Sequence, residues 1–145
     1  MRAAAPIIAA LLITACGPSP MGSPATQAPP ADAPTAVAPD YAGDFDALGT
    51  EPFWSVKVRS AGLIVSRPDH QDIATTGTTL EVMGEEALFR ARTDGQDFSL
   101  RLTPGECSDG MSDRRYDYLA EARIDGLILK GCASRPRDLA TQPRP

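Results

Sequence analysis

The stretch ALFRARTDGQDFSLRLT, residues 87–103, decides the fold class of this chain. In its second half, apolar side chains such as Phe98 and Leu100 alternate with polar ones. A period of two is typical of a β-strand that buries one face and exposes the other. The dipeptide Asp94-Gly95 separates the two halves, and Asp-Gly is a strong signal for a hairpin turn. The stretch therefore predicts two antiparallel strands joined by a tight turn.

Similar alternation on both sides of this hairpin predicts an all-β domain. We expect seven strands, over residues 53–59, 63–66, 78–83, 87–93, 97–103, 118–124 and 127–132. The side chains expected to point inward include Trp54, Val56, Val58, Leu80, Val82, Phe89, Ala91, Phe98, Leu100 and Leu102. The polar residues 67–77 are expected to form a loop. Short strands and tight turns predict an antiparallel meander that either closes into a small barrel or folds over as a sandwich.

The composition changes along the chain and predicts its domain organisation. Seven prolines fall between Gly17 and Asp40, so residues 16–40 are expected to be a disordered tether, because such a segment buries too little apolar surface to offset its ordering entropy. Residues 41–134 are expected to form the β domain. The last segment, residues 135–145, contains three prolines and is expected to be a flexible tail.

The N-terminal residues have the pattern of an export signal. Met1-Arg2 is followed by an apolar run that is too short to span a membrane, so residues 1–15 are expected to be a signal peptide. The run ends in LITAC, which resembles the lipobox of bacterial lipoproteins. The resemblance implies that Cys16 becomes the lipidated N-terminus, with palmitate-like acyl chains that anchor the protein to a membrane. An ordinary signal peptide cut nearby and a buried helix are the alternatives.

The lipoprotein interpretation also sets the expected location and redox state. In the enterobacterial sorting pattern an aspartate after the lipidated cysteine retains a lipoprotein in the inner membrane, and here Gly17 follows Cys16. We therefore expect an outer-membrane anchor facing the periplasm. In that oxidising compartment the two remaining cysteines, Cys107 and Cys132, are expected to form a disulfide. Two buried thiols or a metal pair are the alternatives, but without C-x-x-C spacing and with one histidine we expect no zinc site.

The segment CSDGMSDRRY, residues 107–116, is the main candidate for function. Its Ser, Asp and Gly residues are turn formers, and Tyr116 can form a hydrogen bond through its hydroxyl group, which predicts a loop that satisfies its own polar groups. A second interpretation is a recognition loop that presents Asp109, Met111 and Arg115 to a partner. A third is a calcium site on the loop's aspartates, but EF-hand spacing is missing.

Two further features enter the candidate site. Asp113 can pair with Arg114 or Arg115. In GTEPFW, residues 49–54, Trp54 is the single tryptophan and is expected to plug the core, with its indole N–H needing an acceptor. The alternative is that Glu51 lines a pocket beside Trp54.

Several function classes find no support in the sequence. The net charge is −5 without a basic stripe, which argues against nucleic acid as a partner. His70, the single histidine, lies in a turn-like segment, and the chain contains neither a P-loop nor a dinucleotide-binding glycine pattern. We therefore expect no catalytic residues, no cofactor and no bound metal.

The three motifs GTEPFW, CSDGMSDRRY and the final GC together resemble an uncharacterised family of proteobacterial envelope proteins, which are often lipoproteins. The resemblance spans residues 45–133 and departs from the family pattern at Asp117, where proline commonly follows the tyrosine. It implies a β domain in the cell envelope and brings no established activity with it.

These observations predict a non-enzymatic, membrane-anchored lipoprotein whose β domain binds a protein, a glycan or another envelope ligand. The residues expected to form the binding surface are Glu51, Trp54, Asp109, Met111, Asp113 and Arg115. A purely structural envelope module is the alternative. A small-molecule carrier with an interior cavity is a third possibility.

Overall fold

The computed structural model describes residues 39–142, which belong to one compact unit. The expected signal peptide over residues 1–15, the lipid site Cys16 and most of the expected tether over residues 16–40 lie outside the described residues. Within the described range, no helix has the length and apolar character needed to cross a membrane.

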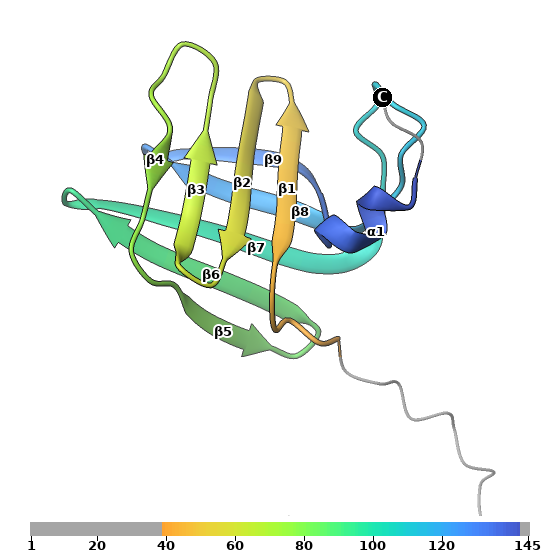
Figure 1. Ribbon diagram of the computed structural model, residues 1–145, viewed down its shortest axis with the longest axis horizontal. Coiled ribbons are helices and arrows are strands. Elements are labelled where there is room, and N and C mark those ends of the chain that lie inside the picture. The colour runs from red at the N-terminus through yellow and green to blue at the C-terminus, as the bar shows by residue number, and fades with distance from the viewer. Residues whose placement is uncertain (1–38, 143–145) are drawn as a thin grey trace, which may run out of the picture. The chain divides into compact units, whose positions relative to one another are not determined.

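The described residues form one antiparallel sheet of nine strands and a short helix (Figure 1). The elements are β1 (Phe45–Thr50), β2 (Phe53–Arg59), β3 (Gly62–Ser66), β4 (Ile73–Ala74), β5 (Thr79–Met83), β6 (Glu86–Thr93), β7 (Gln96–Cys107), β8 (Tyr116–Ile124), β9 (Leu127–Ser134) and α1 (Pro136–Ala140). The all-β antiparallel prediction is confirmed, with nine strands in place of seven. The two additional strands are β1, whose buried positions include the small residues Ala47 and Gly49, and β4, a two-residue strand in the expected 67–77 loop.

The order of the strands forces the sheet to curl. The sheet runs β4-β3-β2-β1-β9-β8-β7-β6-β5, so β4 and β5 lie at opposite edges. In a flat sheet eight steps of about 4.8 Å would separate the two edges by roughly 38 Å. Only residues 75–78 connect β4 to β5, and such a link spans at most about 18 Å. The sheet therefore bends into a half-barrel. Of the two expected architectures, the observed one is a single curled sheet and not the two separate sheets of a sandwich.

The core lies between the two halves of this curled sheet. Strands β1, β2 and β3 cross in front of β6, β7, β8 and β9 at a steep angle (Figure 1). As predicted, every second side chain of β2 is buried from Trp54 to Val58. The same holds in β7 from Phe98 to Leu102. Aromatic rings join the two layers, because Phe45 of β1 lies 5.8 Å from Phe89 of β6 between ring centroids. Burying such side chains is the main stabilising term of the domain.

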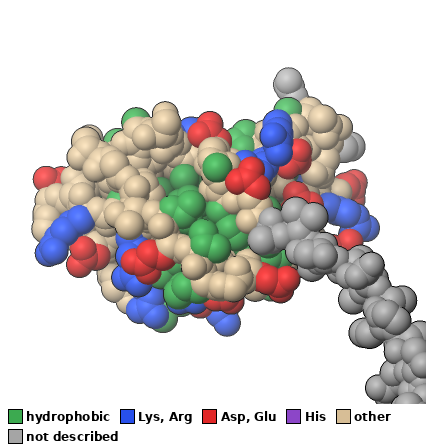
Figure 2. Space-filling view, turned by 90° about the horizontal axis from the view of Figure 1, so that it is seen from below, with side chains coloured by type: hydrophobic (Ala, Val, Ile, Leu, Met, Phe, Trp, Pro, Cys, Tyr) green, Lys and Arg blue, Asp and Glu red, His purple; other side chains and the backbone are tan. Residues whose placement is uncertain are grey.

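Strand β5 departs from the prediction. Leu80 and Val82 were expected to point into the core, but they are 40% and 56% exposed. The reason is that β5 is an edge strand and the opposite edge strand β4, with two residues, is too short to cover it. Figure 2 views the molecule from below, and hydrophobic side chains gather at the centre of that face with charged side chains around them.

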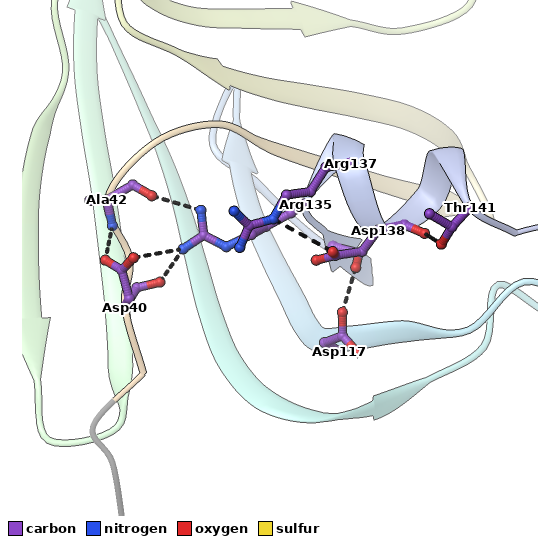
Figure 3. Close-up of polar contacts among 8 residues, drawn as sticks. Asp40, Ala42, Asp117, Arg135, Arg137, Asp138 and Thr141 are labelled. Carbon is purple, nitrogen blue, oxygen red and sulfur yellow. Dashed lines mark hydrogen bonds and ion pairs between the residues drawn. The ribbon is translucent and has the colours of Figure 1, made fainter.

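The segment after β9 also departs from the prediction of a flexible tail over residues 135–145. Helix α1 forms there, Leu139 is buried, and Arg135 is fixed beside the start of β1. The Arg135 guanidinium donates to the carbonyl oxygens of Ala42, at 2.7 Å, and Asp40 (Figure 3). It also lies 4.6 Å from the centroid of the Phe45 ring. Proline at the first turn of a helix is favourable, so the proline content was compatible with a helix.

Candidate functional site

GTEPFW and CSDGMSDRRY, the two motifs singled out in the sequence, meet in the structure around one open pocket of about 470 Å³. Its side chains come from the β1–β2 hairpin, the end of β3 and the loop after β7. They are Leu48, Thr50, Phe53, Trp54 and Ser55, then Ser66, Arg67 and Pro68, and finally Asp109, Met111 and Ser112. The Thr50 hydroxyl donates to the Asp109 carbonyl oxygen at 3.3 Å, across 59 residues of sequence. The pocket therefore lies where the β1–β2 hairpin, the end of β3 and the loop after β7 meet.

The first wall of the pocket depends on Trp54. Its side chain is 3% exposed, and the indole N–H donates to the Lys130 carbonyl oxygen of β9 at 3.3 Å. Gly49 lies directly opposite Trp54 in the ladder, and any larger side chain there would collide with the indole ring. The predictions that Trp54 plugs the core and that its N–H needs an acceptor are both confirmed.

Phe53 precedes Trp54 and points to the opposite side of β2. Adjacent residues of a strand face opposite sides, so burial of Trp54 leaves Phe53 outward and 53% exposed. Phe53 is not among the residues predicted for the binding surface. Its position, an aromatic residue out of phase with the buried residues of its strand, was a signal that could have identified it.

The second wall is the loop between β7 and β8, which is organised by the Asp109 carboxylate. Oδ1 accepts hydrogen bonds from the backbone N–H groups of Met111, at 3.0 Å, and Ser112, at 2.8 Å. Oδ2 accepts from the hydroxyl groups of Ser112, at 2.7 Å, and Tyr116, at 2.9 Å. Gly110 has a φ of +71°, a value that favours glycine. The predicted turn chemistry and the predicted hydrogen bond of Tyr116 are confirmed.

These hydrogen bonds set the charge state of the loop. Burial raises the pKa of Asp109, but the donors from Met111, Ser112 and Tyr116 outweigh it and lower the pKa to about 2. Burial, followed by the hydrogen bond to this carboxylate, raises the pKa of the Tyr116 hydroxyl. At neutral pH the site therefore holds a carboxylate anion that is fully engaged with its own loop.

A disulfide fastens the base of the loop to the last strand. Cys107 at the end of β7 is bonded to Cys132 of β9, with their Cα atoms 5.6 Å apart, as predicted. Tyr116, Cys132 and Leu139 of α1 form a small second core beside the disulfide. At Gly131 any side chain would collide with the backbone of Leu48, so the close contact of β1 and β9 requires glycine there.

The structure brings together only part of the predicted surface. Trp54, Asp109 and Met111 line the pocket, whereas Glu51, Asp113 and Arg115 are exposed outside its lining. Over residues 39–142, no ion pair joins Asp113 to Arg115, so this one of the two expected pairings of Asp113 is not formed.

The backbone of Arg115 is held by α1, because its N–H donates to Gln142 Oε1 at 2.8 Å and its carbonyl oxygen accepts from Gln142 Nε2 at 2.9 Å. His70 is exposed in the β3–β4 loop, as predicted, and it does not line this pocket. No group of three or more His, Cys, Asp and Glu side chains within residues 39–142 could hold a metal ion.

Comparison of the chain with protein-family models, with curated proteins and with solved structures found no match to any of them.

Proposed function

We propose that this protein is a non-enzymatic, lipid-anchored binding protein of the bacterial envelope, and that the pocket between the two motifs holds an apolar group of its partner. The observation that carries the proposal is the meeting of the two motifs, with Phe53 and Met111 53% and 69% exposed at one mainly apolar pocket. Its volume of about 470 Å³ is within the usual range of ligand pockets, roughly 300–1,000 Å³.

The support around the pocket favours recognition over a purely structural role. Both walls are held in place by the disulfide, by the indole hydrogen bond and by the hydrogen bonds of Asp109. Phe53 and Met111 nevertheless remain exposed to solvent. A pre-arranged pocket loses little conformational freedom on binding, which favours affinity. A hydrophobic side chain of a protein is the simplest group to fill it, because well-packed apolar anchors dominate the energy of protein interfaces.

The chemistry of the lining favours binding over catalysis. Asp109 and Arg67 are the titratable residues of the lining. With a pKa of about 2 and four donors on its oxygens, Asp109 is a weak base at neutral pH. Arg67 forms an ion pair with Asp125. For the carrier alternative, the main core cluster is filled by side chains such as Phe89, Phe98 and Leu100, and the pocket meets this cluster only at Trp54.

Photo-crosslinking in intact cells tests the binding role. A photoreactive amino acid replaces Met111 in the full-length protein, and the matched control replaces Met83, which is 45% exposed on β5. We expect a defined partner to be captured from position 111 and lost in the variant Phe53→Ser, whose melting temperature should stay close to that of the wild type. Equal capture from both positions, or capture that is insensitive to Phe53→Ser, would contradict the proposal.

The anchor has its own test, which does not depend on the pocket. Cells that express the full chain are fed an alkyne-tagged fatty acid, and the label on the protein is detected after membrane fractionation. We expect label on the wild type and none on Cys16→Ser, with the protein moving from the outer-membrane fraction to the soluble fraction. Wild-type protein without label would show that the signal is not that of a lipoprotein.

A further inference from the structure

A second feature lies on strands that do not contribute to the pocket. On the outer face of β6, β7 and β8, three arginines surround a hollow of about 300 Å³, which is lined by Leu88, Arg90, Ser99, Arg101, Glu121 and Arg123. The three guanidinium groups face one carboxylate in this lining, in a chain whose net charge is −5. The carboxylates of Glu81 and Glu86 lie just outside this lining and pair with Arg90 and Arg101, so Arg123 is the arginine of the lining without an ion pair among the described residues.

The ladder places two of the arginines in one row with a hydroxyl group between them. Arg90 of β6 is directly opposite Ser99 of β7, and Ser99 is directly opposite Arg123 of β8. Directly opposite residues have Cβ atoms about 5 Å apart, so the Cβ atoms of Arg90 and Arg123 are about 10 Å apart with Ser99 midway. Two long side chains rooted at that spacing can bring their guanidinium groups together above the serine hydroxyl.

Most of the donors of this row are available to a ligand. Arg123 forms no ion pair with any residue in the described part of the chain. Arg90 lies 3.5 Å from Glu81, but both side chains are about half exposed, at 57% and 46%, and exposed pairs of this kind contribute little. Arg101 is engaged more closely with Glu86, at 2.8 Å, and is a neighbour of the row and not part of it. Each guanidinium has five N–H donors, so one ion pair leaves several free.

We propose that Arg90, Ser99 and Arg123 form a binding site for a phosphate group. Because Ser99 lies between Arg90 and Arg123 in the ladder, the two guanidinium groups can reach a ligand from opposite sides and the hydroxyl group can reach it from beneath, which gives donors in three directions. That arrangement fits a tetrahedral oxyanion better than a planar carboxylate, and arginine is well suited to phosphate recognition. The site is independent of the apolar pocket, so either can fail without the other.

The test uses the full-length chain in a nonionic detergent and follows the arginine Nε–H and backbone N–H signals by nuclear magnetic resonance. Three probes are added in turn: inorganic phosphate, glycerol 3-phosphate as a soluble monoester, and glycerophosphoglycerol as the diester headgroup of an anionic lipid. We expect saturable shifts at Arg90, Ser99 and Arg123. The preferred probe distinguishes a soluble phosphate from a lipid headgroup as the source.

Variants separate a built site from general charge screening. Arg123→Gln is expected to weaken binding by about tenfold or more, as for loss of a charged hydrogen bond, and Ser99→Ala by a smaller factor. Arg137→Gln is the matched control, because Arg137 is an exposed arginine on α1 and the change in charge is the same. Absence of saturable shifts with all three probes, equal shifts with sodium chloride at the same ionic strength, or equal weakening by Arg123→Gln and Arg137→Gln would overturn the proposal.

Discussion

The pocket and the β5 edge both expose large apolar side chains, but for different reasons. At the pocket, Phe53 and Met111 are outward while the backbone beneath them is held by a disulfide, an indole hydrogen bond and the Asp109 carboxylate. At β5, Leu80 and Val82 are exposed because no strand covers them, and the ladder to β6 holds the strand from one side. Exposure alone therefore does not indicate a binding site, and it is the supported frame beneath Phe53 and Met111 that leads us to propose one at the pocket.

The largest loss of stability is expected when the buried support of the first wall is removed. Trp54→Ala deletes the indole ring and its hydrogen bond to Lys130, and it should lower the free energy of unfolding by about 3–5 kcal/mol. Phe53→Ala, on the outer side of the same strand, should cost less than about 1 kcal/mol because the ring is 53% exposed. Urea denaturation followed by circular dichroism measures both, and similar losses would show that Phe53 is also structural.

The next largest effect concerns the disulfide at the base of the second wall. It joins residues 25 apart, and in the chain-entropy model a loop of that size contributes about 3 kcal/mol. We expect Cys107→Ser with Cys132→Ser to lower the melting temperature by several degrees and to increase amide hydrogen exchange in the 108–115 loop. The β5–β6 hairpin should exchange as in the wild type. Uniform loss of protection across the sheet would mean that the disulfide supports the whole domain.

A smaller effect should follow from the charge of Asp109. Asp109→Asn keeps the shape but places an amide N–H₂ among groups that are donors, and it should cost about 1–2 kcal/mol at neutral pH for this partly exposed group. Asp113→Asn is the control, because Asp113 is exposed and outside the pocket lining. Equal stability of the two variants would remove Asp109 from its organising role.

The same carboxylate predicts a pH dependence. Its folded-state pKa of about 2 lies below the ordinary value of 3.8, so its contribution to stability is fully present above about pH 4 and is lost as the pH falls towards 2. In that window the wild type should lose more stability than Asp109→Asn, which cannot titrate at this position. Parallel losses in urea titrations at pH 4 and pH 2.5 would contradict the low pKa.

The smallest effect is expected at the β5 edge. Val82→Thr removes apolar surface that is 56% exposed, so the free energy of unfolding should change by less than about 0.5 kcal/mol. Capture of a partner from position 111 should also be unchanged. A loss of crosslinking in this variant would show that β5 belongs to the binding surface and would remove the distinction between the two regions.

The comparison also shows how far sequence reasoning reaches. Strict alternation identified the buried faces of β2 and β7, and turn chemistry identified the internal hydrogen bonds of the 108–115 loop, because both depend on neighbouring residues. It failed at β5, where the alternation is present but no partner covers the strand. The sequence-based prediction also failed at residues 136–140. There the burial of Leu139 against Tyr116 and the disulfide stabilises a helix that the local sequence does not predict.

For the candidate site, residue type pointed to the right two segments of the chain, but it did not tell which of their side chains line the pocket. Asp109, Met111 and Trp54 were selected by their chemistry and line the pocket, whereas Glu51, Asp113 and Arg115 were selected on the same grounds and lie outside it. Whether a loop side chain points into a pocket depends on backbone direction at each position, which is set by contacts such as those of Gln142 with Arg115.

By itself, the sequence determined the all-β class, the antiparallel hairpins and the pairing of Cys107 with Cys132, because periodicity, turn residues and the cysteine count act locally or by elimination. Only the tertiary structure decided that the sheet curls, because this follows from joining β4 and β5, at opposite edges, through residues 75–78. Curling sets which strands are covered and which are left at an edge. It also folds the loop after β7 against the β1–β2 hairpin, so the two motifs share one pocket only after the chain has closed on itself.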